Sequence, residues 1–112
     1  MNLDTTNKKM KTLISFALRD ESLDYFNNED VIYTGIGKIA ASYHLTKAIS
    51  TKKPDIIINL GSAGSNIFPA KTLVNCTAFI QRDMNGIPLG FDRWVTPFSN
   101  EPALLQYGRR IP

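Results

Sequence analysis

Three short segments of the sequence carry groups that could do chemistry. They are Arg19-Asp20-Glu21, Gly35-Ile36-Gly37 and Gly61-Ser62-Ala63-Gly64. A carboxylate such as Glu21 can orient or deprotonate a water molecule, and glycines let backbone N–H groups approach a ribose or an anion. Each segment follows a stretch that we expect to be a strand, and ligands of open parallel sheets bind beyond the carboxyl ends of the strands. We therefore expect the three segments to meet at one edge of a sheet.

The expected strands are short apolar runs. They cover Met10 to Ala17, Val31 to Thr34, Ile56 to Leu60 and Leu73 to Gln81. The run Ile56 to Leu60 (IIINL) is typical of a strand covered on both faces, and such strands belong to parallel sheets.

The clearest expected helix covers Lys38 to Lys53. It repeats apolar residues at the spacing of one helix face, and Pro54 would end it. A brief helix is expected at Asp20 to Phe26 and a helical turn at Ala103 to Gln106. Strand, helix and strand in succession indicate a right-handed crossover and an α/β layered fold.

Composition and charge narrow the class of protein. The chain has 112 residues, 43% apolar and 21% charged, which is ordinary for one small globular domain. We expect a disordered tail at residues 1–9 and one domain over residues 10–112. The formal charge of +3 comes from basic residues scattered along the chain, whereas a nucleic-acid protein concentrates them on one face. No nucleic-acid partner is therefore expected.

Cys76 is the single cysteine. It excludes an intramolecular disulfide, and its place in an expected strand predicts that it is buried. No stretch of about eighteen apolar residues occurs, so we expect no membrane partner and a soluble, cytoplasmic protein.

A dinucleotide site is not expected, although the segment from Gly35 to Ala40 fits the G-x-G-x-x-G/A pattern. That pattern requires an acidic residue about twenty positions later to hold the ribose hydroxyls. Asn59 and Leu60 stand there instead. The sequence predicts no cofactor and no metal.

Longer stretches around these segments resemble a known family. Met10 to Glu21 (MKTLISFALRDE), Thr34 to Ala41 (TGIGKIAA) and Lys53 to Gly64 (KPDIIINLGSAG) are similar in order, spacing and sequence to the opening half of a methylthioadenosine/adenosylhomocysteine nucleosidase. Gln81 to Phe91 and Tyr107 to Pro112 resemble its later segments. The resemblance, to the purine nucleoside phosphorylase superfamily, implies a three-layer α/β sandwich with a mainly parallel mixed sheet, here truncated to the N-terminal half.

The resemblance also implies site residues for cleavage of a purine nucleoside. Glu21 matches the water-activating glutamate, Ser62 the serine near water and ribose, and Ala63 and Gly64 the backbone that lines the nucleoside pocket, while Ile36 would pack near the ribose. Alternative interpretations stay open at this stage. Glu21 taken alone would be a solvated acid in a first helical turn, Ser62 a turn hydroxyl, and the glycines plain turn residues.

The family's purine-protonating aspartate and ribose-binding glutamate would both follow Pro112. A protein limited to these residues should therefore be nearly inactive, which favours a fragment or a subunit that pairs with a separately encoded C-terminal half. Asn85-Gly86 replaces the family's usual acidic and β-branched pair in a loop that often reaches the second subunit. A homodimer is consequently an open expectation.

Three functions remain as hypotheses. The first is hydrolysis of the N-glycosidic bond of a purine nucleoside by water. The second is phosphorolysis by a purine or uridine nucleoside phosphorylase, but that reaction needs cations around phosphate, and Arg19 is the only cation near Glu21 in the sequence. The third is a non-catalytic fragment or split-enzyme subunit.

Overall fold

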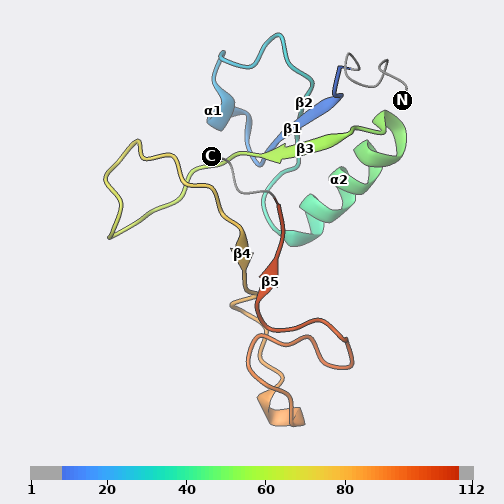
Figure 1. The fold of residues 1–112 in the computed structure, drawn as a ribbon, viewed down its shortest axis with the longest axis vertical. Coiled ribbons are helices and arrows are strands. Elements are labelled where there is room, and N and C mark those ends of the chain that lie inside the picture. The colour runs from blue at the N-terminus through green and yellow to red at the C-terminus, as the bar shows by residue number, and fades with distance from the viewer. Residues whose placement is uncertain (1–8, 109–112) are drawn as a thin grey trace, which may run out of the picture. The chain divides into compact units, whose positions relative to one another are not determined.

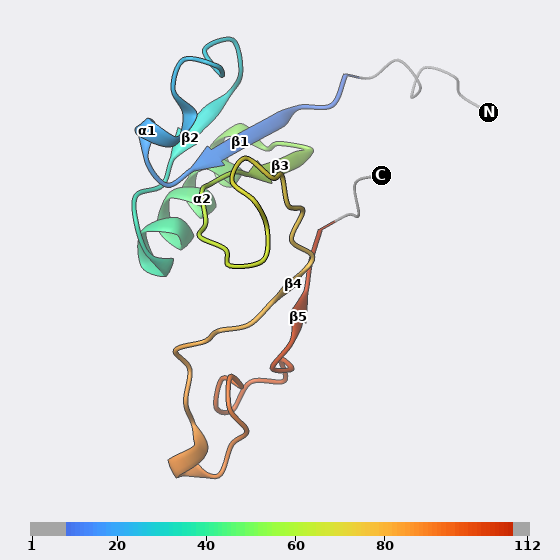
Figure 2. The ribbon, with the colours of Figure 1, turned by 90° about the vertical axis from the view of Figure 1, so that its left-hand side faces the viewer.

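The computed structural model describes residues 9–108. Most of the expected tail at residues 1–9 and the last residues of the Tyr107 to Pro112 segment therefore lie outside the described residues. The chain divides into two compact units, Met1–Gly64 and Ser65–Pro112 (Figures 1 and 2).

The first unit is built on a three-stranded sheet in the order β2-β1-β3. The strands are β1 (Thr12–Phe16), β2 (Val31–Tyr33) and β3 (Ile56–Asn59). β1 pairs in parallel with both neighbours, with Ile14 opposite Val31 on one side and Ile58 on the other. The expected α/β fold with a parallel sheet is confirmed, and the first three expected strands each exist with slightly narrower bounds.

The central strand β1 carries the core of this unit. Leu13, Ile14 and Phe16 are buried, and so is the intervening Ser15. The ring of Phe26 packs edge-on against Phe16 at a centroid distance of 5.1 Å. β1 is also the central strand of the sheet, with a neighbouring strand paired to each of its edges.

The expectation that Ile56 to Leu60 is covered on both faces is wrong for this structure. Ile57 and Ile58 of β3 keep 37% and 39% of their surface exposed. β3 is the outermost strand of the sheet, so within the described residues one of its edges has no neighbouring strand. The apolar run predicted the strand correctly but not its surroundings.

The helix α2 (Lys38–Lys52) connects β2 to β3 and runs beside the sheet (Figure 1). The helix ends before Pro54, as expected. Lys53 adopts the left-handed conformation, its N–H donates to the Ile49 carbonyl at 3.0 Å, and Pro54 follows. Ala48 is the buried residue of this helix.

The helix α1 (Arg19–Ser22) is four residues long, shorter than the expected Asp20 to Phe26. It ends because Leu23 takes a positive φ of 48°, which is incompatible with a right-handed helix. Turns then lead through Asn27 and Asn28 to β2.

The second unit contains less regular structure than the sequence predicts. Its elements are β4 (Ala78–Phe79), the short 3-10 helix η2 (Ile87–Leu89) and β5 (Leu105–Gln106), with β4 and β5 paired antiparallel. The expected strand Leu73 to Gln81 is thus reduced to two residues, and the helical turn expected at Ala103 to Gln106 is wrong. Both segments are strands only over the two residue pairs that the ladder joins, Ala78 with Gln106 and Phe79 with Leu105.

Cys76 is exposed, so its expected burial is also wrong. It lies just before β4, outside the paired residues. The two errors have one cause, because the predicted burial of Cys76 depended on its place inside the longer expected strand.

Tight packing explains why a glycine follows Asn85 in the Asn85-Gly86 pair. A Cβ on Gly86 would lie 3.0 Å from Cγ of Pro97 and 3.2 Å from Cβ of Phe91, closer than most Cβ contacts allow. Asn85 accepts a hydrogen bond from the Ile87 N–H through its side chain. The pair therefore shapes a tight turn within the second unit.

Candidate functional site

The carboxylate of Glu21 lies against the loop that follows β3. Its Oε2 accepts hydrogen bonds from the Ser62 N–H at 2.9 Å and from the Ser62 hydroxyl at 3.3 Å. Its Oε1 accepts one from the Leu18 N–H at 3.0 Å. The structure thus brings together two of the five predicted site residues, Glu21 and Ser62, although they are 41 positions apart.

The parallel pairing of β1 and β3 is what makes this contact. Glu21 follows the carboxyl end of β1, and Ser62 follows that of β3. The register is held by the Leu60 N–H, which donates to the Ser15 carbonyl, and by the buried Ser15 hydroxyl, which donates to Asn59 Oδ1; both distances are 2.9 Å. Adjacent parallel strands end at the same edge, so the two loops meet.

These hydrogen bonds lower the pKa of Glu21 below its ordinary value of 4.5. The largest cause is the Ser62 backbone N–H and the next is the Leu18 N–H, while desolvation opposes them. Donors aimed at a carboxylate stabilise its charged form. Glu21 is therefore ionised at neutral pH.

A carboxylate held in this way can orient water and stabilise positive charge. It is a weak proton acceptor, because general bases work best when their pKa lies near the working pH. Its electrostatic effect does not depend on a raised pKa. The geometry therefore suits a reaction in which cationic charge develops on a bound molecule.

The other predicted site residues follow the carboxyl ends of β2 and β3, at the same edge of the sheet. Ile36 follows β2 and is 77% exposed, and Ala63 and Gly64 are exposed in the loop after β3. The positive φ angles of Gly35 and Gly37, 79° and 98°, show that backbone conformation alone requires glycine at both positions.

Gly61 begins one of the three candidate segments, but it was not among the predicted site residues. A Cβ added to it would lie 3.3 Å from Glu21 Oε2, so its lack of a side chain gives the carboxylate room beside Ser62. Its position at the start of Gly61-Ser62-Ala63-Gly64 indicated that it lies near the site. The sequence could not show that an oxygen of Glu21 approaches it.

Gly61→Ala should raise the pKa of Glu21 toward 4.5. The added methyl group would push Oε2 by a few tenths of an ångström and lengthen its hydrogen bonds to Ser62. A carboxyl-detected NMR titration measures this pKa. Gly64→Ala is the matched control, since its Cβ would enter open space; an equal shift in both variants would contradict the close approach.

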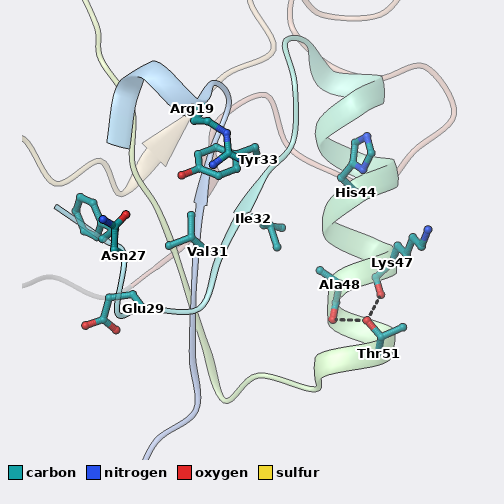
Figure 3. A pocket seen from close by; sticks show the side chains of 11 residues that line it. Arg19, Asn27, Glu29, Val31, Ile32, Tyr33, His44, Lys47, Ala48 and Thr51 are labelled. Carbon is teal, nitrogen blue, oxygen red and sulfur yellow. Dashed lines mark hydrogen bonds between the residues drawn. The ribbon is translucent and has the colours of Figure 1, made fainter. Parts of the chain in front are cut away.

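An open groove of about 710 Å³ lies elsewhere on the first unit, between β2 and α2 (Figure 3). Its walls include Tyr33 and Ile32 from β2 and Ala48 from α2, and Arg19 lies at one end. Neither Glu21 nor Ser62 lines it. The sequence analysis predicted no groove at this place.

Two features are absent from residues 9–108, the part of the chain that the structure describes. Those residues contain no group of three His, Cys, Asp or Glu side chains arranged to hold a metal ion. They also contain no helix with the length and apolar character needed to cross a membrane.

No protein-family model matches the chain. A stretch of 43 residues is 46% identical to a 5'-methylthioadenosine/S-adenosylhomocysteine nucleosidase of Staphylococcus carnosus (strain TM300). The match covers 37% of this chain and 19% of that relative, so the chain corresponds to a minor part of its length. Over that stretch the chain is similar to a nucleosidase, which agrees in kind with the resemblance found in the sequence.

Proposed function

We propose that the chain carries the water-facing and ribose-facing part of a purine nucleoside N-ribohydrolase. The observation that supports this most directly is the Glu21–Ser62 contact, in which Glu21 Oε2 lies 2.9 Å from the Ser62 backbone nitrogen. The similarity to a nucleosidase over 43 residues supports it independently.

The proposed reaction breaks the bond between the anomeric carbon of the ribose and a purine nitrogen. The bonding electrons leave with the purine, and positive charge develops on the sugar as they depart. Water forms the new C–O bond and loses one proton, which passes through solvent to the departing purine. Glu21 would face this charge and orient the water, while Ser62 holds the carboxylate. Ala63, Gly64 and Ile36 are proposed to line the nucleoside site.

Hydrolysis is favoured over phosphorolysis by the surroundings of Glu21. Its hydrogen-bond donors are neutral backbone and hydroxyl groups, and an ionised carboxylate repels a phosphate dianion. Arg19, the cation nearest in sequence, instead lies over the ring of Tyr33, 4.5 Å from its centroid.

The larger assembly is also part of the proposal. The parallel sheet of the first unit would form the start of the three-layer sandwich of the nucleoside phosphorylase type. A separately encoded C-terminal half would supply the acid that protonates the departing purine, and a second copy of the chain would form the proposed homodimer. With Glu21 and Ser62 alone, the purine leaves as an anion and turnover is slow.

The test is adenine release from methylthioadenosine and adenosylhomocysteine by the purified protein, with and without phosphate. NMR spectra of Glu21 and Ser62 during nucleoside titration give a second readout. We expect slow release that is independent of phosphate, together with shifts at both residues.

Adenine release that requires phosphate would contradict hydrolysis and support a nucleoside phosphorylase. Absence of both release and shifts at the two residues would refute nucleoside cleavage and favour the non-catalytic fragment.

A further inference from the structure

We propose that the hydroxyl pair of Ser22 and Tyr33 is a positioning device that holds Glu21 against Ser62. The pair is outside the residues that the nucleosidase resemblance implies. Its consequence for catalysis rests on the proposed function, but the positioning itself can be measured without any activity.

The helix that carries Glu21 needs an anchor. α1 has four residues, and its N-cap residue, Leu18, has no polar side chain to cap the helix; the Leu18 N–H instead donates to Glu21. Isolated helices shorter than about 12 residues are unstable in water. The residue after it, Leu23, has a φ of 48°, a conformation that costs free energy for a residue with a side chain. Contacts with the rest of the unit must offset both costs.

Ser22 supplies that contact from the last position of α1. Its residue surface is 1% exposed, and its Oγ lies 2.7 Å from the hydroxyl oxygen of Tyr33 on β2. The Ser22 hydroxyl also donates to the carbonyl of Arg19 at 3.0 Å. If its single proton is used there, the Tyr33 hydroxyl is the donor to Ser22 Oγ, and both groups are satisfied.

Tyr33 also contacts the N-terminal end of α1. The guanidinium of Arg19, the first residue of α1, lies over its ring (Figure 3), a cation–π contact. The ring of Tyr33 in turn stacks on the buried Phe16 at a centroid distance of 6.2 Å. One side chain of β2 thus contacts both ends of α1 and rests on the core.

Glu21 precedes Ser22 directly, so a shift of α1 moves its carboxylate. The hydrogen bonds from Glu21 Oε2 to Ser62 have lengths of 2.9 and 3.3 Å, and a displacement of about 1 Å breaks the longer one. β3 positions Ser62, and the Ser22–Tyr33 pair positions Glu21. Both sides of the contact are therefore fixed by the sheet.

Tyr33→Phe is the decisive variant because it removes one oxygen and keeps the ring that contacts Arg19 and Phe16. Two changes are expected. The pKa of Glu21 rises toward 4.5, measured by carboxyl-detected NMR on the folded protein, and the rate of adenine release falls by about tenfold with little change in KM.

Tyr25→Phe is the matched control, since Tyr25 is exposed, and it should change neither quantity. Ser22→Ala should shift the pKa in the same direction as Tyr33→Phe and at least as far, because it also removes the hydrogen bond to the Arg19 carbonyl. The double variant should shift it no further than Ser22→Ala, because the contact between the two hydroxyls is already lost. A Glu21 pKa that stays at the wild-type value in folded Tyr33→Phe would overturn the positioning role.

The outcomes also separate this inference from the proposed function. A raised pKa in Tyr33→Phe, with no adenine release from the wild-type protein, would support the positioning device and refute the nucleosidase. Adenine release by the wild type, with an unchanged Glu21 pKa and an unchanged rate in Tyr33→Phe, would support the nucleosidase and refute the positioning device.

Discussion

Glu21→Gln should lower the rate of adenine release by about 10²–10³-fold, because it removes an electrostatic stabilisation of the transition state. The amide keeps the shape of the side chain but removes the negative charge that faces the developing cation in the proposed reaction. It also turns one of the two oxygens that accept from Leu18 and Ser62 into a donor group. Single-turnover assays at high protein concentration measure the difference.

Asp20→Asn is the matched control for this variant. Asp20 is the adjacent acid in α1 and is exposed, so the same change of charge should leave the rate within about twofold. Equal losses in the two variants would point to overall charge rather than to the Glu21 position. Because the pKa of Glu21 lies below 4.5, the wild-type rate should not fall on its account until the pH drops below that value.

Gly37→Ala should destabilise the first unit by about 1–3 kcal/mol. Gly37 is the N-cap of α2, with φ 98° and ψ 161°, a conformation that is essentially restricted to glycine. Open space surrounds the position of its Cβ, so the loss would come from the backbone and not from a clash. Urea denaturation followed by circular dichroism measures it.

Gly64→Ala serves as the control for stability. Its Cβ also meets open space, but its φ lies outside the left-handed region, so the free energy of unfolding should change by no more than about 0.5 kcal/mol. Equal stability of Gly37→Ala and wild type would show that the backbone relaxes at this turn.

The fold was predictable where local signals were dense. Pro54 and the apolar spacing of Lys38 to Lys53 predicted α2 to within one residue of its observed end at Lys52. After Ser65 the strand β4 is set by a two-residue pairing with Leu105–Gln106, and no property of Leu73 to Gln81 alone indicates where such a distant partner begins and ends.

The sequence predicted which edge of the sheet carries the site, but not which atoms are in contact there. The rule that parallel strands end together correctly indicated that Glu21 and Ser62 would meet. The roles of Gly61 and of the Ser22–Tyr33 pair depend on distances of 3.3 and 2.7 Å. Such distances arise from tertiary packing, and the residue types alone do not reveal them.

The exposed isoleucines of β3 have a consequence for how the protein behaves in the test tube. An outer strand with an uncovered apolar surface is a nucleus for strand-to-strand association between molecules. Encounters of that kind scale with the square of the protein concentration, whereas folding within one chain does not depend on it. Dilution should consequently favour the dispersed state, and the concentrated samples needed for NMR should lose soluble protein fastest.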